Sequence, residues 1–326
     1  MKLISGIIGR IRAGAAIKTV LGSCCGRTAS FAAFAGLALG GVLCPPMRCL
    51  PAQDGVPEAK AIITAHDESG KAVELTADDL QIMEDGRRAT VREVRSLRGT
   101  PIHYCLVFDS SGSERAAFQW QKNEAVKLLQ TTVRARVDRG RFVPFNYESW
   151  PGAETDNPEE ISGAIAQEQA LGATALYDAM AECSTRMSET APDPGLRAMF
   201  VFSDGMDNAS RLNIEETVRE LVNADIRVYA VGGRPNQSED KKEFKRGAKN
   251  LTELAGKTGG RVYFPADEKE VDAMAASVAD ELHNSFLVVY GPTGEKGHAG
   301  PHQLKIRCTK KDISITAPEK STGGYM

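Results

Sequence analysis

The chain has 326 residues, of which 42% are hydrophobic and 25% are charged. This composition is typical of a folded globular protein and excludes a fibrous or wholly disordered one. Residues 1–52 contain six Lys or Arg and no Asp or Glu, so the rest of the chain has 34 basic against 43 acidic residues, a net charge near −9. This acidic balance argues against nucleic acid as a partner.

The first 52 residues differ from the rest and predict an export signal. Basic residues come first, and an apolar run of about 14 residues follows at 31–44. A spanning helix needs roughly 20 apolar residues. The run is followed by Pro45, Pro46 and, at a suitable cleavage position, Ala52. We therefore expect a periplasmic, cell-envelope or extracellular protein. The alternative is an uncleaved N-terminal anchor, which would associate the chain with the membrane.

Three cysteines follow the leader, and all three lie in apolar patterns. Cys105 and Cys308 fall in predicted strands, and Cys183 falls in a predicted helix. We expect each to be a small core residue and not a metal ligand or disulfide partner. The sequence has no CxxC pair and no Cys/His zinc spacing, so it predicts no thiolate or imidazole site for a transition metal such as zinc.

Two β-rich segments flank the middle of the chain. Residues 57–98 alternate between apolar and polar positions and contain an Asp-Gly hairpin signal, which predicts a short β segment. Residues 285–326 contain the runs "SFLVVY", "HQLKIRC" and "DISITA", which predict a C-terminal β tail.

Residues 101–284 alternate between apolar runs and amphipathic stretches. The predicted strands are Ile102–Phe108, Arg141–Tyr147, Leu196–Phe202, Arg227–Val231 and Arg261–Phe264. The predicted helices are Arg115–Val133, Thr174–Ser188, Asn213–Asn223, Glu243–Lys257 and Glu268–Leu282. Short runs such as "AMFVF" are typical of parallel strands that helices cover on both faces. The pattern predicts an α/β fold with a doubly wound, mostly parallel sheet, flanked by the short β segments.

Three predicted loops place oxygen-bearing side chains after strands or before helices. Asp109, Ser111 and Ser113 follow the first strand of the α/β region, Thr174 opens a predicted helix, and Asp204 follows "AMFVF". In an open α/β sheet, ligands bind beyond the carboxyl ends of the strands. Carboxylates and hydroxyls are ligands for hard divalent cations. The five residues predict a site for Mg²⁺, with Mn²⁺ or Ca²⁺ as alternatives.

The same residues resemble the metal-ion-dependent adhesion site of the von Willebrand factor type A (VWA) domain. Asp109, Ser111 and Ser113 match its DxSxS element, and Thr174 in "GATALYDA" and Asp204 in "FSDGMDN" match the other two elements. The resemblance implies that the hydroxyls contact the ion and that the aspartates bind it through water. It also implies that an acidic side chain of a partner completes the coordination sphere.

The β segments on both sides of this region also resemble the bacterial VWFA-related exported proteins. Members of that family often end in an Arg-x-Gly-Tyr-Tyr-like motif, whereas this chain ends in "STGGYM". The resemblance therefore assigns no role to the last residues.

Four further polar residues lie beside these elements. We expect Asp178, four residues after Thr174, to be structural. Asp207 and Asn208 either stabilise the loop around Asp204 or are ordinary turn residues. Glu114 is expected to begin the next helix.

The favoured hypothesis is an exported adhesion or binding protein, not an enzyme, that captures an Asp or Glu carboxylate of a protein partner through the cation. One alternative is a metal-assisted hydrolase, but the sequence has no GxSxG elbow and no evident general base. Another is a structural module of an envelope assembly in which the ion only holds the loops together.

Overall fold

The structure is a computed structural model that describes residues 58–190, 195–233, 241–293 and 301–321. All of them belong to one compact unit. The predicted leader and the closing Gly-Gly-Tyr lie outside the described residues. Within the described ranges, no helix combines the length and apolar character needed to cross a membrane.

A five-stranded parallel sheet forms the centre of the α/β region. Its strands are β4 (Ile102–Asp109), β5 (Arg139–Phe145), β6 (Leu196–Phe202), β7 (Ile226–Val231) and β8 (Arg261–Tyr263). Every residue of β4, β6 and β7 is buried, which explains why these strands are almost continuously apolar in the sequence.

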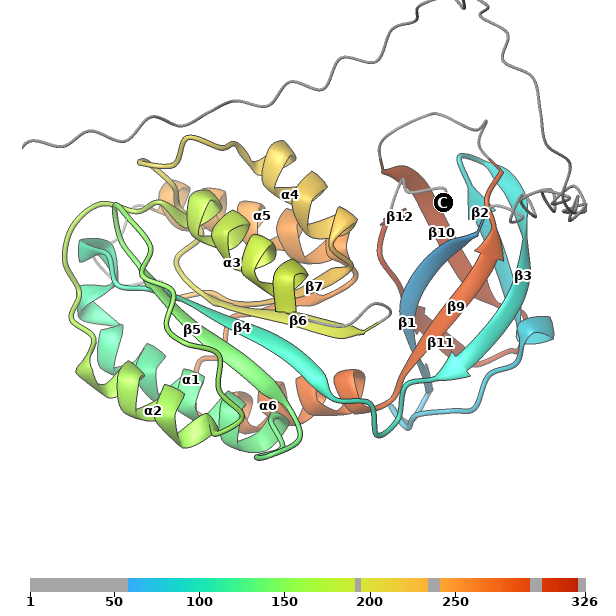
Figure 1. The fold of residues 1–326 in the computed structure, drawn as a ribbon, viewed down its shortest axis with the longest axis horizontal. Coiled ribbons are helices and arrows are strands. Elements are labelled where there is room, and N and C mark those ends of the chain that lie inside the picture. The colour runs from blue at the N-terminus through green and yellow to red at the C-terminus, as the bar shows by residue number, and fades with distance from the viewer. Residues whose placement is uncertain (1–57, 191–194, 234–240, 294–300, 322–326) are drawn as a thin grey trace, which may run out of the picture. The chain divides into compact units, whose positions relative to one another are not determined.

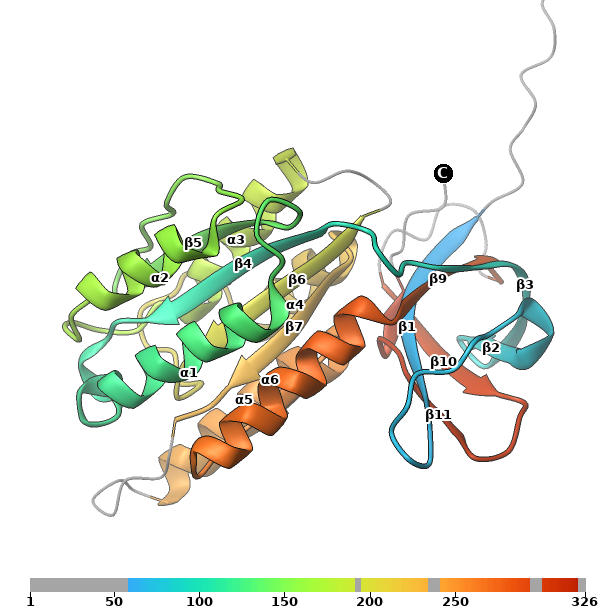
Figure 2. The same ribbon diagram turned by 90° about the horizontal axis from the view of Figure 1, so that it is seen from below.

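Six helices cover both faces of this sheet (Figures 1 and 2). They are α1 (Phe118–Thr132), α2 (Pro158–Gln167), α3 (Leu176–Thr190), α4 (Ile214–Asn223), α5 (Lys241–Thr258) and α6 (Glu268–His283). One apolar cluster joins α1, α2 and α6 to one face, and a second joins α3, α4 and α5 to the other. The predicted doubly wound α/β fold is confirmed.

The strand order is β5-β4-β6-β7-β8, so the chain leaves β4 towards one side and later returns to its other side. The carboxyl end of β4 is therefore the topological switch point of the sheet. Crevices for ligands form at such points because the connections on the two sides diverge there. Asp109 is the last residue of β4.

The two flanking β segments combine into one seven-stranded sheet. Its order is β11-β1-β9-β3-β2-β10-β12. The strands are β1 (Ala59–Asp67), β2 (Leu80–Glu84), β3 (Arg87–Ser96), β9 (Ser285–Gly291), β10 (His302–Cys308), β11 (Ile313–Thr316) and β12 (Lys320–Ser321). β9 pairs with both β1 and β3, so the C-terminal segment completes the sheet that the N-terminal segment begins. A separate apolar cluster that includes Ile63, Ile82 and Tyr290 supports it.

The buried carboxylate of Glu84 links these two β segments. It accepts hydrogen bonds from the hydroxyl of Tyr290 at 3.1 Å, the backbone N–H of Thr293 at 2.7 Å and the hydroxyl of Ser321 at 3.2 Å. These donors satisfy a charged group that would otherwise be costly to bury.

The α2 helix was not predicted from the sequence. Its start does carry local signals, because the Asn157 side chain accepts the N–H of Glu159 and Pro158 occupies the first turn. Its apolar face consists of little more than Ile161 and Ile165, and Gly163 lies between them. So short a stripe gives a weak periodicity, and packing against α1 and β5 decides that the helix forms.

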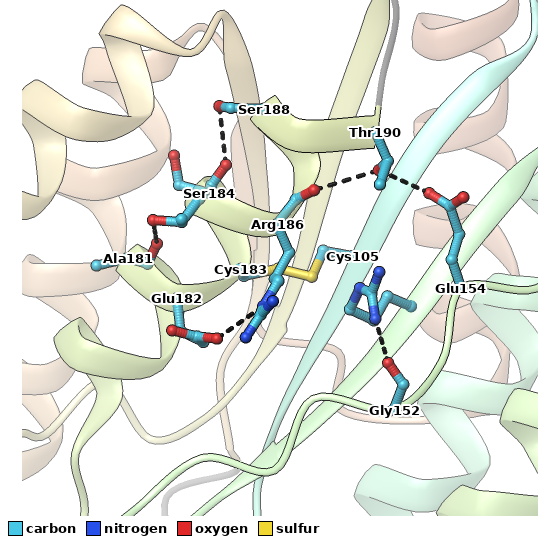
Figure 3. Close-up of a disulfide and its surroundings, with 12 residues drawn as sticks. Cys105, Gly152, Glu154, Ala181, Glu182, Cys183, Ser184, Arg186, Ser188 and Thr190 are labelled. Atoms are coloured by element: carbon cyan, nitrogen blue, oxygen red, sulfur yellow. Dashed lines mark hydrogen bonds and ion pairs between the residues drawn. A yellow bond between two sulfur atoms is a disulfide. The ribbon is translucent and has the colours of Figure 1, made fainter. Parts of the chain in front are cut away.

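The structure joins Cys105 of β4 and Cys183 of α3 in a disulfide (Figure 3). The expectation that both are unpaired core cysteines is therefore wrong. They are 78 residues apart in sequence, yet their Cα atoms lie 6.4 Å apart, within the range that a disulfide spans. Because α3 packs on the face of the sheet to which Cys105 points, only the tertiary fold brings the two together. Cys308 remains free.

Candidate metal centre

The DxSxS segment turns back on itself directly after β4. Asp109 is fully buried, and its Oδ1 accepts the backbone N–H of Ser111 at 2.9 Å. This bond closes a tight turn that brings the hydroxyl oxygens of Ser111 and Ser113 to 2.9 Å from each other. The segment therefore holds two adjacent hydroxyls next in sequence to a buried carboxylate.

Ser203, which is not among the five predicted donors, holds the other oxygen of Asp109. Its hydroxyl donates to Oδ2 at 2.6 Å and accepts the N–H of Gly205 at 3.1 Å. Ser203 follows β6 directly, so this contact ties the ends of β4 and β6 together. It fixes the orientation of the Asp109 carboxylate and leaves few other arrangements open to it.

Asp204 lies next to Asp109, with Glu114 as a third acidic neighbour. Carboxylate oxygens of the three residues lie within 4.8 Å of one another. Burial raises the pKa of Asp109 to about 7, and the charge of Asp204 adds to the effect, although Ser203 and Ser111 donate hydrogen bonds that oppose it. Ionised together, these groups repel each other, and a divalent cation would remove the repulsion. The donor set therefore fits a hard divalent cation.

Glu114 is a part of this cluster that the sequence did not predict. It lies in a 3₁₀ turn at Gly112–Ala116 and is 3% exposed. Its expected role was to begin the following helix, but α1 starts only at Phe118. Its position directly after Ser113 was the signal that could have placed it in the cluster.

Thr174 is buried, and its backbone is bound to the Asp204 loop. Its N–H donates to the side-chain oxygen of Asn208 at 2.9 Å, and its carbonyl accepts the N–H groups of Asn208 and Ala209 at 3.0 and 3.1 Å. The structure thus brings Asp109, Ser111, Ser113 and Asp204 into one cluster and anchors Thr174 to the loop that carries Asp204.

Asp207 and Asp178 strengthen the connection between the Asp204 loop and α3. Asp207 accepts the N–H of Tyr177 at 3.1 Å and the hydroxyl of Ser210 at 2.6 Å, so it caps the helix. Asp178 accepts the N–H groups of Leu212 and Arg211. Burial opposes the ionisation of Asp178, but these N–H groups and the Arg211 guanidinium outweigh it and lower its pKa. Its predicted structural role agrees with these contacts.

Two features of the α/β region matter for its classification: the parallel sheet has its switch point at β4, and the three donor loops follow the order DxSxS, Thr, Asp. In both respects the α/β region resembles a VWA domain.

No protein-family model matches the chain, and no curated protein matches it significantly. Solved structures similar to it include BatB from Bacteroides thetaiotaomicron, with 14% identity and a TM-score of 0.45 over 55% of this chain and 97% of that one. A von Willebrand factor type A protein from Catenulispora acidiphila has 12% identity and a TM-score of 0.43 over 83% of this chain and 75% of that one. Proximal thread matrix protein 1 from the mussel byssus, with a zinc-occupied MIDAS motif, has 18% identity and a TM-score of 0.44 over 56% of this chain and 48% of that one.

A cavity of about 190 Å³ opens beside the candidate donors Ser113 and Asp204 of the α/β region. Ser113 and Asp204 form part of its wall, and Met206 and Phe244 contribute apolar surface. A group bound at the cation would therefore find space on the side of Ser113 and Asp204.

Two glycines allow the Asp204 loop to pack against α5. Gly205 has a φ of +78°, which disfavours other residues, and a Cβ added to it would overlap the carbonyl oxygen of Gly247. A Cβ on Gly247 would in turn overlap the carbonyl oxygen of Asp204. No local signal in the sequence marks Gly247, because the contact joins segments that are more than 40 residues apart.

We expect Gly247→Ala to lower the free energy of unfolding by about 1–3 kcal/mol, since the new methyl group must displace the Asp204 backbone. The displacement should also weaken cation binding. Urea unfolding and a Mn²⁺ titration would measure the two effects. The matched control is Gly163→Ala in α2, where an added Cβ has no neighbour within 4 Å. The control should be slightly stabilising and leave Mn²⁺ binding unchanged. If the two variants had the same stability and the same Mn²⁺ affinity, the close packing of Gly247 against the Asp204 backbone would be contradicted.

Proposed function

We propose that this protein is an exported binding protein that holds a divalent cation at Asp109, Ser111, Ser113, Thr174 and Asp204 and captures an acidic group of a protein partner. The observation that carries the proposal is the paired hydroxyls of Ser111 and Ser113 beside the mutually repelling carboxylates of Asp109 and Asp204. Mg²⁺ is the favoured ion, with Mn²⁺ and Ca²⁺ as alternatives, because all the donors are oxygens.

Each residue has a distinct part in this proposal. Ser111, Ser113 and Thr174 would supply hydroxyl oxygens to the ion, and the carboxylates of Asp109 and Asp204 would balance its charge through water. Ser203 keeps the Asp109 carboxylate oriented, and Asn208 keeps Thr174 close to Asp204. The bound cation would supply an open coordination position for a carboxylate. Neutral direct ligands leave the ion enough positive charge to attract one.

The disulfide supports the export part of the proposal. Disulfides persist in oxidising compartments and are rare in the cytosol of most organisms. Cys105 and Cys183 are both fully buried, so their bond has no exposed position from which it could serve as a surface redox group. A structural disulfide agrees with the periplasmic, envelope or extracellular location that the leader predicts.

Calorimetric titration of the EDTA-treated chain with MgCl₂ tests the cation site, and retention on immobilised poly-glutamate tests carboxylate capture. We expect saturable Mg²⁺ binding, and retention on poly-glutamate in Mg²⁺ that EDTA abolishes. Poly-glutamine is the uncharged control and should retain nothing.

Other results would contradict the proposal in distinct ways. If the chain binds none of Mg²⁺, Mn²⁺ and Ca²⁺, the proposed cation site is wrong. Mg²⁺ binding that raises the unfolding temperature without affecting retention would indicate an ion that only holds the loops together. Mg²⁺-dependent turnover of a hydrolysable substrate would indicate an enzyme.

A further inference from the structure

Large apolar side chains are exposed at five positions among the described residues, namely Val137, Tyr147, Trp150, Leu171 and Phe264. The three most exposed are Tyr147 at 58%, Leu171 at 54% and Trp150 at 45%. Single exposed apolar residues need no explanation, but a group of them commonly marks an interaction surface. We call Tyr147, Trp150 and Leu171 the rim patch.

Backbone hydrogen bonds join the loops of the rim patch to the DxSxS segment. The N–H of Leu171 donates to the carbonyl of Ser110 at 2.7 Å, and the N–H of Gly112 donates to the carbonyl of Gly172 at 3.0 Å. This second bond joins neighbours of both groups. Its acceptor, Gly172, follows Leu171 in the sequence, and its donor, Gly112, lies between Ser111 and Ser113.

The loop that carries the two aromatic residues meets the same point. The carbonyl of Asn146 accepts the N–H of Ala175, next to Thr174, at 2.6 Å, and a Cβ added to Gly172 would lie 3.4 Å from Cδ1 of Tyr147. Tyr147 thus lies against the segment that carries Leu171. The rim patch borders the candidate cation site on the side of Ser111, Ser113 and Thr174.

The aromatic residues are held in an ordered turn. The carbonyl of Glu148 accepts the N–H of Asn146 at 2.9 Å, and the N–H of Trp150 donates to the carbonyl of Pro144 at 3.0 Å. The rings of Tyr147 and Trp150 meet edge to face, with centroids 6.1 Å apart. Exposed aromatic side chains that are already ordered lose little conformational entropy when a partner covers them.

Charge restricts what the rim patch can bind. The candidate cation site calls for an anionic group on the partner, whereas the exposed Glu148 lies between the two aromatic residues in sequence. At the rim patch itself, Glu148 favours a basic residue of the partner over an acidic one. A segment with one acidic residue, a neighbouring apolar residue and a basic residue complements all three features.

We propose that the rim patch is a second contact site for the same protein partner and binds a large apolar side chain that flanks the acidic residue held by the cation. The inference rests on the proposed function and adds the partner's chemistry to it. The occupant is an exposed segment of another protein that contains an acidic residue, a large aliphatic or aromatic residue nearby, and a Lys or Arg to meet Glu148.

A random linear peptide library displayed on phage provides the probe. The full chain, in MgCl₂, selects peptides that are then eluted with EDTA. We expect the eluted peptides to contain Asp or Glu with Trp, Phe, Leu or Ile close by, and to be enriched in Lys or Arg. One such peptide is then synthesised in three forms: unchanged, with the acidic residue replaced by its amide, and with the apolar residue replaced by Ser.

The triple variant Tyr147→Ser, Trp150→Ser, Leu171→Ser tests the rim patch against the control Val137→Ser. Val137 is similarly exposed but precedes β5, at the opposite end of that strand from Tyr147. We expect the triple variant to bind the unchanged peptide about tenfold more weakly than wild type, with unchanged Mg²⁺ affinity. It should not discriminate against the Ser form of the peptide, because the contact that recognises the apolar residue is gone. The control should behave as wild type.

The possible failures are distinguishable. If the wild-type chain binds no Mg²⁺, the proposed function falls together with this inference. If Mg²⁺ binds and acidic peptides are eluted without apolar neighbours, or the triple variant binds the unchanged peptide as tightly as wild type does, only the rim patch assignment is overturned. Two further outcomes would overturn the rim patch assignment in favour of another occupant. One is self-association of the chain that the triple variant abolishes. The other is selective Mg²⁺-dependent binding of polygalacturonate in place of the peptides.

Discussion

Replacing Cys105 and Cys183 together by alanine is expected to lower the free energy of unfolding by about 4 kcal/mol, since their bond closes a loop of 78 residues in the unfolded chain. The disulfide also links β4, which ends at Asp109, to α3, which follows Thr174, and so braces two of the three donor loops (Figure 3). Urea unfolding of the oxidised wild type, the reduced wild type and the double variant would measure the effect.

The reduced wild type separates the loss of the cross-link from the loss of buried sulfur atoms, because it keeps both sulfurs. Cys308→Ala is the matched single control, as Cys308 is free and only partly buried, and its effect should be small. Mass spectrometry of an unreduced digest should find the Cys105 and Cys183 peptides linked. Finding both as free thiols in protein purified from an oxidising compartment would contradict the disulfide.

Asp109→Asn is expected to abolish the stabilisation of the protein by Mg²⁺. At a cation concentration of roughly 100 times the dissociation constant, that stabilisation amounts to about 2.7 kcal/mol in wild type. The amide has the shape of the carboxylate, and its oxygen can still accept the N–H of Ser111, so the fold should persist. Unfolding temperatures in MgCl₂ and in EDTA, together with calorimetric titration, would measure the change.

The exposed Asp272, which pairs with Lys127 on the surface, offers a control for the loss of one carboxylate. Asp272→Asn should bind Mg²⁺ as wild type does. If Asp109→Asn also binds Mg²⁺ with wild-type affinity, Asp109 does not belong to the cation site.

Wild type and Asp109→Asn are also expected to differ in how their stability depends on pH when no cation is present. The pKa of Asp109 is about 7 in the folded chain against 3.8 ordinarily, so folding favours its protonated form. Cation-free wild type should therefore lose stability as the pH rises from 3.8 to about 7, and the loss should be complete above that value. Asp109→Asn should lack this component of the pH dependence. Denaturant unfolding in EDTA across this range would show whether the two proteins differ as expected.

Much of the α/β region could be predicted from local pattern. Strands such as Leu196–Phe202 are apolar throughout because both of their faces are buried, and the helix after Asn213 begins with a capping box. The residues of the DxSxS turn were also predictable, because the hydrogen bond from Ser111 to Asp109 spans only two residues. Interactions of such short range depend on residue type and spacing, which the sequence displays directly.

The remaining features depend on contacts between distant segments. Ser203 binds Asp109 across 94 residues, Cys183 bonds to Cys105 across 78, and Gly247 leaves space for the Asp204 backbone. The pairing of β9 with β1 and β3 likewise joins the two ends of the described chain in one sheet. By itself, the sequence determined the fold class and the five candidate donors. Only the tertiary structure decided how their carboxylates are oriented, which acidic neighbour joins them and which exposed side chains border them, because those properties come from packing between residues that no local pattern connects.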